Sequence, residues 1–210
     1  CFWRIHARQT ILAAGALERP IAFADNDRPG IMLASAVRSY LNRYGVATGK
    51  RVTVFANNDN ARRTARDLIA AGVKVAAIID SRPHASAVED CPVYTGATVI
   101  GTTGRKGLRQ ITVAHKGGEI QIETDCLAMS GGWNPTLHLT CHMNGRPVWN
   151  DKIAAFVPSD GAVPDLIPAG AAKGIFSTAG CLKSGQAAAL EALGVLGIAA
   201  VAGELPSAEE

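Results

Sequence analysis

The sequence lacks the features that mark several large classes of protein. Its five cysteines are far apart, odd in number and without a Cys-x-x-Cys pair, so we expect reduced thiols and no dithiol redox centre. The 21 basic and 18 acidic residues are scattered along the chain. No basic patch is dense enough to hold a phosphate backbone, which argues against nucleic acid as a partner. There is no internal repeat and no low-complexity segment.

Long hydrophobic runs are also missing. The longest apolar stretch, residues 187–202, is interrupted by Glu191 and is rich in Ala and Gly, which is typical of a buried helix and not of a membrane span. No basic-then-apolar segment opens the chain, and no membrane partner is expected. The reduced thiols predict a cytoplasmic protein. The first residue is Cys1, not Met, and an apolar strand follows at once. We therefore interpret the chain as an excerpt of a longer polypeptide.

The composition that is present suits a globular protein. Hydrophobic residues make up 48% of the 210 residues and aromatic residues only 5%, enough for one large or two small domains with a real core. Residues 9–14 form a short apolar run that ends at Gly15 and predicts a buried parallel strand. A helix is expected over residues 31–44, with Gly45 as its left-handed C-terminal cap.

Residues 51–80 have the pattern of a nucleotide-binding βαβ unit, but the turn is unusual. A dinucleotide fingerprint places glycines there, so that the backbone can approach a pyrophosphate, and an acid at the end of the second strand. Asp80 is at that strand end, whereas the turn from Asn57 to Ala61 has no glycine and contains Asp59. The acid favours helix capping over phosphate binding, and capping is the preferred interpretation.

Three arginines follow this turn, Arg62, Arg63 and Arg66. They are candidates for binding an NADP 2′-phosphate, but a solvated helix face or a subunit contact is the preferred interpretation.

The rest of the chain predicts further strands and one helix. A polar link covers residues 81–92. The runs at 108–115 and 119–124 alternate apolar and polar residues around a Lys-Gly-Gly turn, which predicts an antiparallel hairpin. Residues 148–159 predict a second hairpin, residues 165–170 a short buried strand, and residues 184–201 an Ala-rich helix.

Three segments carry a resemblance to a known family. The segment "ILAAGALERPIAFADNDRPGIMLASAVRSYL", then "VFANNDNARRTARDL" and "AMSGGWNPTLHL", resemble the alpha subunit of bacterial heterotetrameric sarcosine oxidases. The likeness covers nearly the whole chain, and the motifs are more specific together than singly. The plan is more distantly similar to two-dinucleotide-domain flavoprotein reductases and to opine oxidase and cyanide synthase subunits.

The resemblance implies an α/β fold of the FAD/NAD(P)-binding kind, with three layers, a parallel sheet, helices and a small antiparallel sheet. It implies that residues 1–49 and 125–210 form part of the first, NAD-holding domain. Residues 50–124 would then be an inserted, degenerate second dinucleotide-binding domain. The family's N-terminal Gly-rich loop and its folate-binding domain are not in this sequence.

The family resemblance also implies an activity for the complex, the oxidative demethylation of sarcosine to glycine. The products would include formaldehyde or methylene-tetrahydrofolate, and hydrogen peroxide. NAD would be bound in this subunit, FAD and covalent FMN in or beside partner subunits, and tetrahydrofolate on a domain absent here. The expected partners are the beta, gamma and delta subunits.

Two small-residue corners are the candidate cofactor site. The first is Ala14, Gly15 and Ala16, which looks like the strand-end corner beside the dinucleotide in two-domain flavoproteins. The second begins at Gly170 and Ala171, where flavin-binding relatives have Gly-Asp, and losing that carboxylate argues against flavin and suits NAD. Phe176 and Thr178 are expected to form the wall of this site. Trp133 is either a ligand-stacking residue or, by preference, a packed residue between domains.

Other chemistry finds little support in the sequence. His138, Cys141 and His142 are close together, but no second pair supplies a four-ligand zinc site, so no metal is expected. No catalytic residue is predicted. Two alternatives stay open: an NAD(P)H-dependent flavoprotein reductase, and a ligand-free scaffold for subunit assembly.

Overall fold

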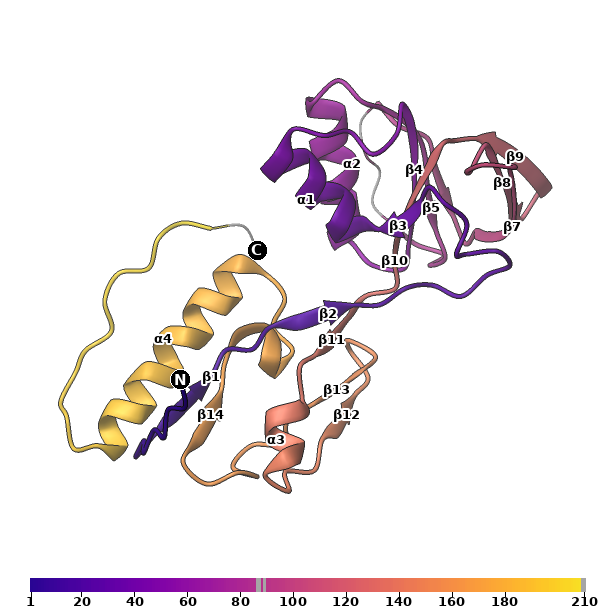
Figure 1. Ribbon diagram of the computed structural model, residues 1–210. Coiled ribbons are helices and arrows are strands. Elements are labelled where there is room, and N and C mark those ends of the chain that lie inside the picture. The colour runs from indigo at the N-terminus through magenta and orange to yellow at the C-terminus, as the bar shows by residue number, and fades with distance from the viewer. Residues whose placement is uncertain (86–87, 89, 209–210) are drawn as a thin grey trace. The chain divides into compact units, whose positions relative to one another are not determined.

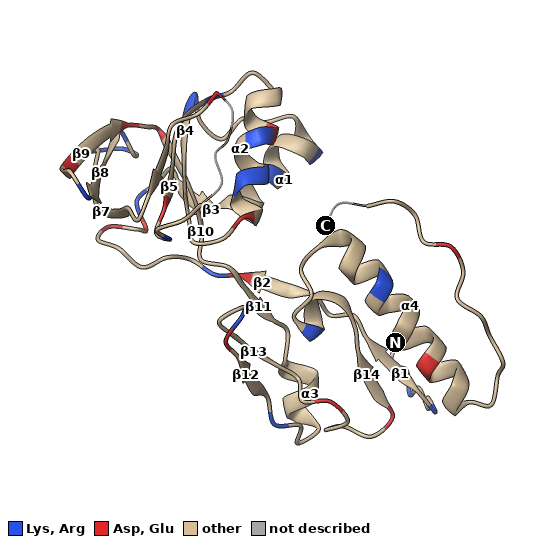
Figure 2. Ribbon diagram, turned by 180° about the vertical axis from the view of Figure 1, so that it is seen from behind, with Lys and Arg blue, Asp and Glu red and all other residues tan. Residues whose placement is uncertain are grey.

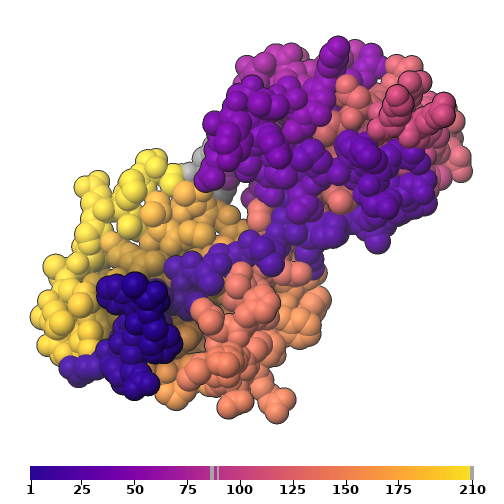
Figure 3. All heavy atoms as spheres, viewed as in Figure 1, coloured from indigo at the N-terminus to yellow at the C-terminus, as the bar shows by residue number. Residues whose placement is uncertain are grey.

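The structure is a computed structural model and describes residues 1–85, 88 and 90–208. Its contacts divide the chain into two compact units (Figure 1). The central unit is Glu18–Gly132, and the terminal unit combines Cys1–Leu17 with Trp133–Glu210. In the space-filling view the first residues of the chain, in indigo, lie against its orange and yellow C-terminal part within the terminal unit (Figure 3).

The strands are β1 (Thr10–Leu12), β2 (Ala16–Glu18), β3 (Ile31–Leu33), β4 (Arg51–Ala56), β5 (Lys74–Asp80), β6 (Val93–Thr95), β7 (Thr98–Thr103), β8 (Gln110–His115), β9 (Gly118–Glu123), β10 (Cys126–Ser130), β11 (Trp133–Pro135), β12 (Val148–Asn150), β13 (Ala155–Val157) and β14 (Leu166–Pro168). The helices are α1 (Ala34–Tyr44), α2 (Asn60–Ala70), α3 (His138–His142), the short 3₁₀ helix η1 (Gly170–Lys173) and α4 (Thr178–Val195).

The central unit has three layers. A parallel sheet of order β3-β10-β4-β5-β6 lies in the middle, with α1 and α2 on one face and the antiparallel sheet β7-β8-β9 on the other (Figure 1). Alternate residues of β4 serve the two faces: Val52 and Val54 pack toward the helices and Phe55 toward β7–β9. The strand is buried on both sides, which explains its nearly continuous apolar run. This architecture confirms the expected α/β fold.

Several predicted elements are present with changed limits. Gly45 caps α1 with φ +64°, as expected, but the predicted helix 31–44 starts only at Ala34. Residues 31–33 instead form β3, which pairs with β10 at the edge of the sheet. The hairpin predicted over 108–124 is β8–β9. The polar link predicted over 81–92 lies partly outside the described residues.

The central unit is wider than the predicted inserted domain. The sequence suggested residues 50–124, with 1–49 and 125–210 together in the other domain. In the structure β3, α1 and β10 belong to the central unit, because β3 and β10 join the parallel sheet and α1 packs on α2.

The terminal unit holds α4 and the small sheets β1-β14 and β12-β13, and β11 pairs with β2. The predicted strand at 165–170 is β14, which pairs in parallel with β1, and the predicted hairpin at 148–159 is β12–β13. The C-terminal helix was predicted to begin at Ser184, but α4 begins at Thr178 because Ser177 caps it. Lys183 and Glu191 are the only charged residues of α4 (Figure 2). None of the described helices, α4 included, combines the length and the hydropathy of a membrane span.

Candidate nucleotide site

The two predicted corners meet because of how β1 and β14 pair. Leu12 at the end of β1 lies opposite Pro168 at the end of β14, and the Ala169 N–H donates to the Leu12 carbonyl oxygen at 3.0 Å. The strands are parallel, so the segments that follow β1 and β14 leave the sheet at the same carboxyl edge (Figure 1). Ligands of open α/β sheets bind at that edge. The pairing therefore brings the corner of Ala14–Ala16 beside the corner that starts at Gly170.

The first corner needs glycine for its backbone. Gly15 has φ +75°, which side chains rarely adopt, and its carbonyl accepts a hydrogen bond from the Thr136 N–H at 3.0 Å. A Cβ at Gly15 would have no atom of the chain within 4 Å. Ala14 is exposed and Ala16 is partly exposed. Gly15 thus leaves open space just beyond the end of β1.

The second corner is held by α4. Gly170 has φ +60°, and its N–H donates to the Ser184 Oγ at 3.0 Å. A Cβ at Gly170 would lie 3.4 Å from the Cys181 Sγ. The Cys181 thiol itself donates to the Ile175 carbonyl at 3.1 Å. Because the Gly170 N–H is already bonded to Ser184, this residue fixes the corner, and no local pattern predicts that role.

The predicted wall residues lie directly after this corner. Phe176 is half-buried in the turn between η1 and α4, and Thr178 is the exposed first residue of α4. The Ser177 hydroxyl accepts a hydrogen bond from the Gly180 N–H at 3.1 Å, a helix N-cap. Backbone N–H groups of a helix start favour negative charge, such as a phosphate. Ala171 is partly exposed and places no charge there.

The asparagine turn of the central unit is filled by its own side chains. The Asn58 Nδ2 donates to both the carbonyl oxygen and the hydroxyl of Ser130, each at 3.1 Å, and the Asn57 Nδ2 donates to the Gly131 carbonyl at 3.3 Å. These bonds join the carboxyl ends of β4 and β10, where a dinucleotide domain has its crevice. The capping expectation fits, with one change. Asn58, not Asp59, accepts the helix N–H, from Ala61 at 3.3 Å.

The exposed Asp59 instead pairs with the arginines of a charge cluster in which only Arg62 and Asp80 are buried. Its carboxylate accepts hydrogen bonds from Arg62 at 2.9 Å and Arg82 at 2.6 Å. The same two arginines pair with Asp80 at 2.9 Å and 2.8 Å. Arg62 is 3% exposed and Asp80 fully buried. The interpretation of Arg62 as a solvated face or subunit contact is therefore wrong, because its guanidinium neutralises a buried acid.

The cluster also changes the acidity of its members. Burial raises the pKa of Asp80, but hydrogen bonds from Arg82 and Arg62 outweigh burial and bring the pKa below its ordinary value. The hydrogen bond from Arg82 likewise lowers the pKa of Asp59. Asp80 is at the position where a dinucleotide domain has the acid that binds the ribose hydroxyls. Here its carboxylate is paired with Arg62 and Arg82 instead. Arg82 was missed in the sequence, although its place two residues after Asp80 was the available signal.

Several residues of the quoted motifs have structural roles. In "LERP", the Glu18 carboxylate accepts a hydrogen bond from the Ser35 N–H at 2.8 Å, at the start of α1. In "NDRPG", a Cβ on Gly30 would lie 2.7 Å from the Asp125 carbonyl oxygen. In "SGGWNP", a Cβ on Gly131 would lie 2.9 Å from the Pro20 carbonyl. These positions require glycine because backbone passes close by.

The remaining candidates are Trp133, on the strand β11 that pairs with β2 next to the first corner, and three residues of the short helix α3. Trp133 is partly exposed, and its buried Nε1 has no hydrogen-bond partner among the described residues. His138, Cys141 and His142 are all exposed on the short helix α3. Within residues 1–85, 88 and 90–208, no group of His, Cys, Asp and Glu is arranged to hold a metal ion.

Comparison with known proteins gives strong similarity to one kind of subunit. The chain is 45% identical over 198 residues, 93% of its length, to "Sarcosine oxidase subunit alpha" of Rhizobium meliloti (strain 1021). It is 45% identical over 221 residues, 97% of its length, to the protein of the same name from Corynebacterium sp. (strain P-1). The chain spans 20% and 23% of the lengths of these relatives, about a fifth. No family model matches the chain.

Solved structures share the fold at low identity. L-proline dehydrogenase from P. horikoshii aligns with a TM-score of 0.71 and 18% identity, over 93% of this chain and 36% of that one. Thioredoxin reductase of T. acidophilum aligns with a TM-score of 0.65 and 18% identity, over 91% of this chain and 66% of that one. The chain thus shares its fold with these two oxidoreductases.

Proposed function

Taking the chain as a segment of a sarcosine oxidase alpha subunit, we propose that it is the NAD-binding region of that subunit. The proposal places NAD at the carboxyl edge of β1 and β14, against Ala14, Gly15, Ala16, Gly170 and Ala171. Phe176 and Thr178 form its wall. The observation that carries the proposal is the in-register parallel pairing of β1 with β14, which brings two distant small-residue corners together.

The residues at these corners fit a dinucleotide in three respects. Gly15 has open space around it, so a ligand can approach the backbone. The N-terminal turn of α4 offers N–H groups that favour a pyrophosphate. Ala171 has no carboxylate, whereas the resemblance implies an acid at this position in flavin-binding relatives. The loss of that acid favours NAD over flavin.

The central unit, in this proposal, is a former dinucleotide domain that now supports subunit assembly. Amide hydrogen bonds close the end of β4, and the charge cluster occupies the acid of β5. A phosphate group there would displace Asp59 from Arg62 and Arg82, and would meet a carboxylate at the start of a helix. These contacts support one NAD site in the terminal unit and none in the central unit.

For the whole complex we propose the oxidative demethylation of sarcosine to glycine, with formaldehyde or methylene-tetrahydrofolate and hydrogen peroxide as the other products. FAD and covalent FMN are bound in or beside the partner subunits, which are the beta, gamma and delta subunits. Tetrahydrofolate is bound by a domain that is absent from this sequence. This chain binds and orients NAD and contributes no catalytic side chain.

The alternative of an NAD(P)H-dependent flavoprotein reductase finds a similar fold in thioredoxin reductase. The sequence has no Cys-x-x-Cys pair for disulfide chemistry, and Ala171 has no carboxylate. Mass spectrometry of the nucleotides released from the purified complex separates the two. NAD together with two flavins supports the sarcosine oxidase assignment. Flavin released from this subunit alone contradicts it and favours the reductase.

A further inference from the structure

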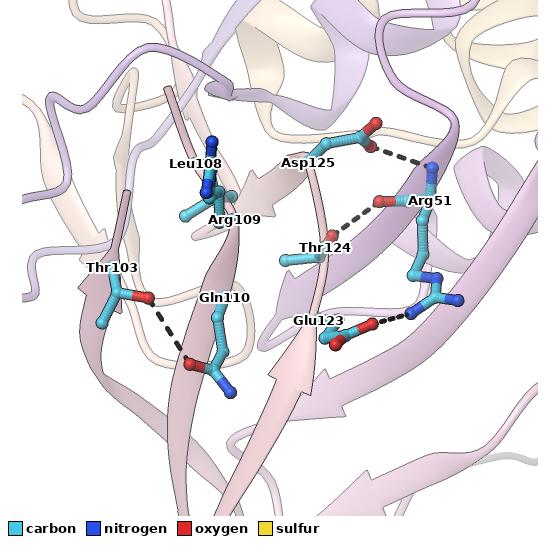
Figure 4. A pocket seen from close by; sticks show the side chains of 8 residues that line it. All are labelled: Arg51, Thr103, Leu108, Arg109, Gln110, Glu123, Thr124 and Asp125. Carbon is cyan, nitrogen blue, oxygen red and sulfur yellow. Dashed lines mark hydrogen bonds and ion pairs between the residues drawn. The ribbon is translucent and has the colours of Figure 1, made fainter. Parts of the chain in front are cut away.

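A pocket of about 510 Å³ lies in the central unit, at the opposite end of β4 from the asparagine turn (Figure 4). Arg51 is the first residue of β4, and Asp125 directly precedes β10, so the pocket lies at the amino edge of the parallel sheet. The volume is in the range of small-molecule sites, which is roughly 300–1,000 Å³. The proposed NAD site and the asparagine turn both lie elsewhere and contain no residue of this pocket.

One row of polar side chains crosses the pocket. Thr103, Gln110 and Glu123 are direct cross-strand neighbours at the end of β7-β8-β9. The Thr103 hydroxyl bonds to the Gln110 Oε1 at 3.5 Å, and the Arg51 Nη1 pairs with the Glu123 carboxylate at 2.6 Å. Figure 4 shows these two pairs on either side of the pocket. Arg51 and Glu123 therefore largely neutralise each other.

The two remaining charged side chains of the pocket do not pair. Among the described residues, no acidic side chain forms an ion pair with Arg109 and no basic side chain forms one with Asp125. The Asp125 carboxylate accepts hydrogen bonds from the backbone N–H groups of Lys50 and Arg51, each at 2.9 Å. These bonds fix the position of the carboxylate and leave its charge in place. The pocket thus presents one uncompensated cation and one uncompensated anion.

We propose that this pocket binds a small zwitterion of the amino-acid class. The ligand carboxylate pairs with the Arg109 guanidinium, whose planar N–H groups suit two-point contact with a carboxylate. The ligand ammonium group is attracted to Asp125, while Thr103 and Gln110 offer polar contacts.

Charge complementarity selects a zwitterion over simpler ions. A ligand with only a carboxylate would be repelled by Asp125, and one with only an ammonium group by Arg109. The inference concerns the central unit alone and does not depend on the NAD proposal.

The test is a titration followed by two-dimensional NMR on the ¹⁵N-labelled full chain. The probes are glycine, acetate and methylammonium, so that each half of the zwitterion is measured separately. We expect glycine to give saturable shifts in residues 103–110 and 123–125. We expect acetate and methylammonium to bind about tenfold more weakly or worse, since a hydrogen bond to a charged group contributes about that much. Acetate that binds as tightly as glycine would mean a simple anion site and would overturn the proposal.

A pair of matched variants tests the residue assignment. Arg109→Gln removes the unpaired guanidinium, and Arg105→Gln removes an exposed charge of the same loop that does not line the pocket. We expect R109Q to weaken glycine binding about tenfold and R105Q to leave it unchanged. Equal binding by both variants, or no saturable shift with the unmodified chain, rejects the site. The three-probe comparison on the unmodified chain decides the question even if R109Q does not fold.

Discussion

The side-chain amide of Asn58 spans from the end of β4 to Ser130 at the end of β10, and donates to both oxygen atoms of that serine at 3.1 Å. The same side chain accepts the Ala61 N–H at the start of α2. One asparagine therefore joins two strands and a helix at the place where a dinucleotide domain keeps an open crevice. The turn is filled by the protein, and we expect its residues to contribute to stability.

Replacing Asn58 with Ala removes all three of these hydrogen bonds. We expect the free energy of unfolding to fall by about 1–3 kcal/mol, because the Ser130 hydroxyl and the helix N–H lose their partner and the Ser130 carbonyl keeps only the Asn57 N–H. Urea denaturation followed by circular dichroism measures the change. Asn134→Ala is the control, since Asn134 is exposed and its side chain makes no hydrogen bond among the described residues. An equal effect of the two substitutions would contradict the bracing role of Asn58.

Arg62→Met leaves the buried Asp80 with one arginine fewer. We expect a loss of about 3–5 kcal/mol in the free energy of unfolding, because an incompletely compensated charge stays buried. Arg66→Met on the same helix α2 is the matched control. Arg66 is exposed, and we expect a change within about 0.5 kcal/mol. A loss below about 1 kcal/mol for Arg62→Met would show that the cluster is not important for stability.

The charge cluster also predicts a pH dependence. The pKa of Asp80 is lower in the folded chain than its ordinary value of 3.8. Its ionised form therefore stabilises the fold above pH 3.8, and this contribution is lost as the pH falls through the lower folded-state pKa. We expect Asp80→Asn to make the free energy of unfolding depend less on pH below this value.

Urea denaturation at a series of acidic pH values gives the slopes for this comparison. Asp27→Asn, which changes an exposed acid, should keep the slope of the unmodified chain. Identical slopes for all three proteins would show that Asp80 does not contribute to the acid response.

Ser184→Ala tests how the second corner is held. It removes the hydroxyl that accepts the Gly170 N–H, and we expect NAD to bind about five- to tenfold more weakly, through a corner that is less fixed. The measurement is NAD titration of the intact subunit.

Gly185→Ala is the neighbouring control on α4. Nothing lies within 4 Å of a Cβ there, so we expect unchanged NAD affinity and about 0.5–1 kcal/mol more stability. The positioning role of Ser184 would be contradicted if Gly185→Ala bound NAD more weakly, or if Ser184→Ala bound it as tightly as the unmodified subunit.

The sequence predicted most of the fold because the hydrophobic patterns were strong. The continuous apolar run of β4, the alternation in β8 and β9 and the cap at Gly45 all led to correct elements. Residues 31–33 were assigned to a helix because their spacing fits one. Pairing with β10, nearly 100 residues away, makes them a strand, and local spacing does not contain that information.

The candidate sites were predicted less completely. The candidate corners at Ala14–Ala16 and Gly170–Ala171 follow β1 and β14, which pair in parallel, and their role in binding NAD stays a prediction. Ser184 and Arg82 were missed, because a contact between a helix residue and a distant corner has no local signature. Arg62 was misjudged since a charged residue on a helix is usually exposed, and its buried partner Asp80 is 18 residues further on.

Isothermal titration calorimetry with NAD tests the central claim most directly, using two variants of the intact subunit. Gly170→Ala introduces a Cβ at φ +60° in the proposed corner, and we expect at least a tenfold loss of affinity, about 1.4 kcal/mol. Replacing Asn57, Asn58 and Asp59 together with Gly should lower stability and change NAD affinity by less than tenfold. The reverse result, with affinity lost in the triple variant and retained in Gly170→Ala, would place NAD at the asparagine turn and contradict the account.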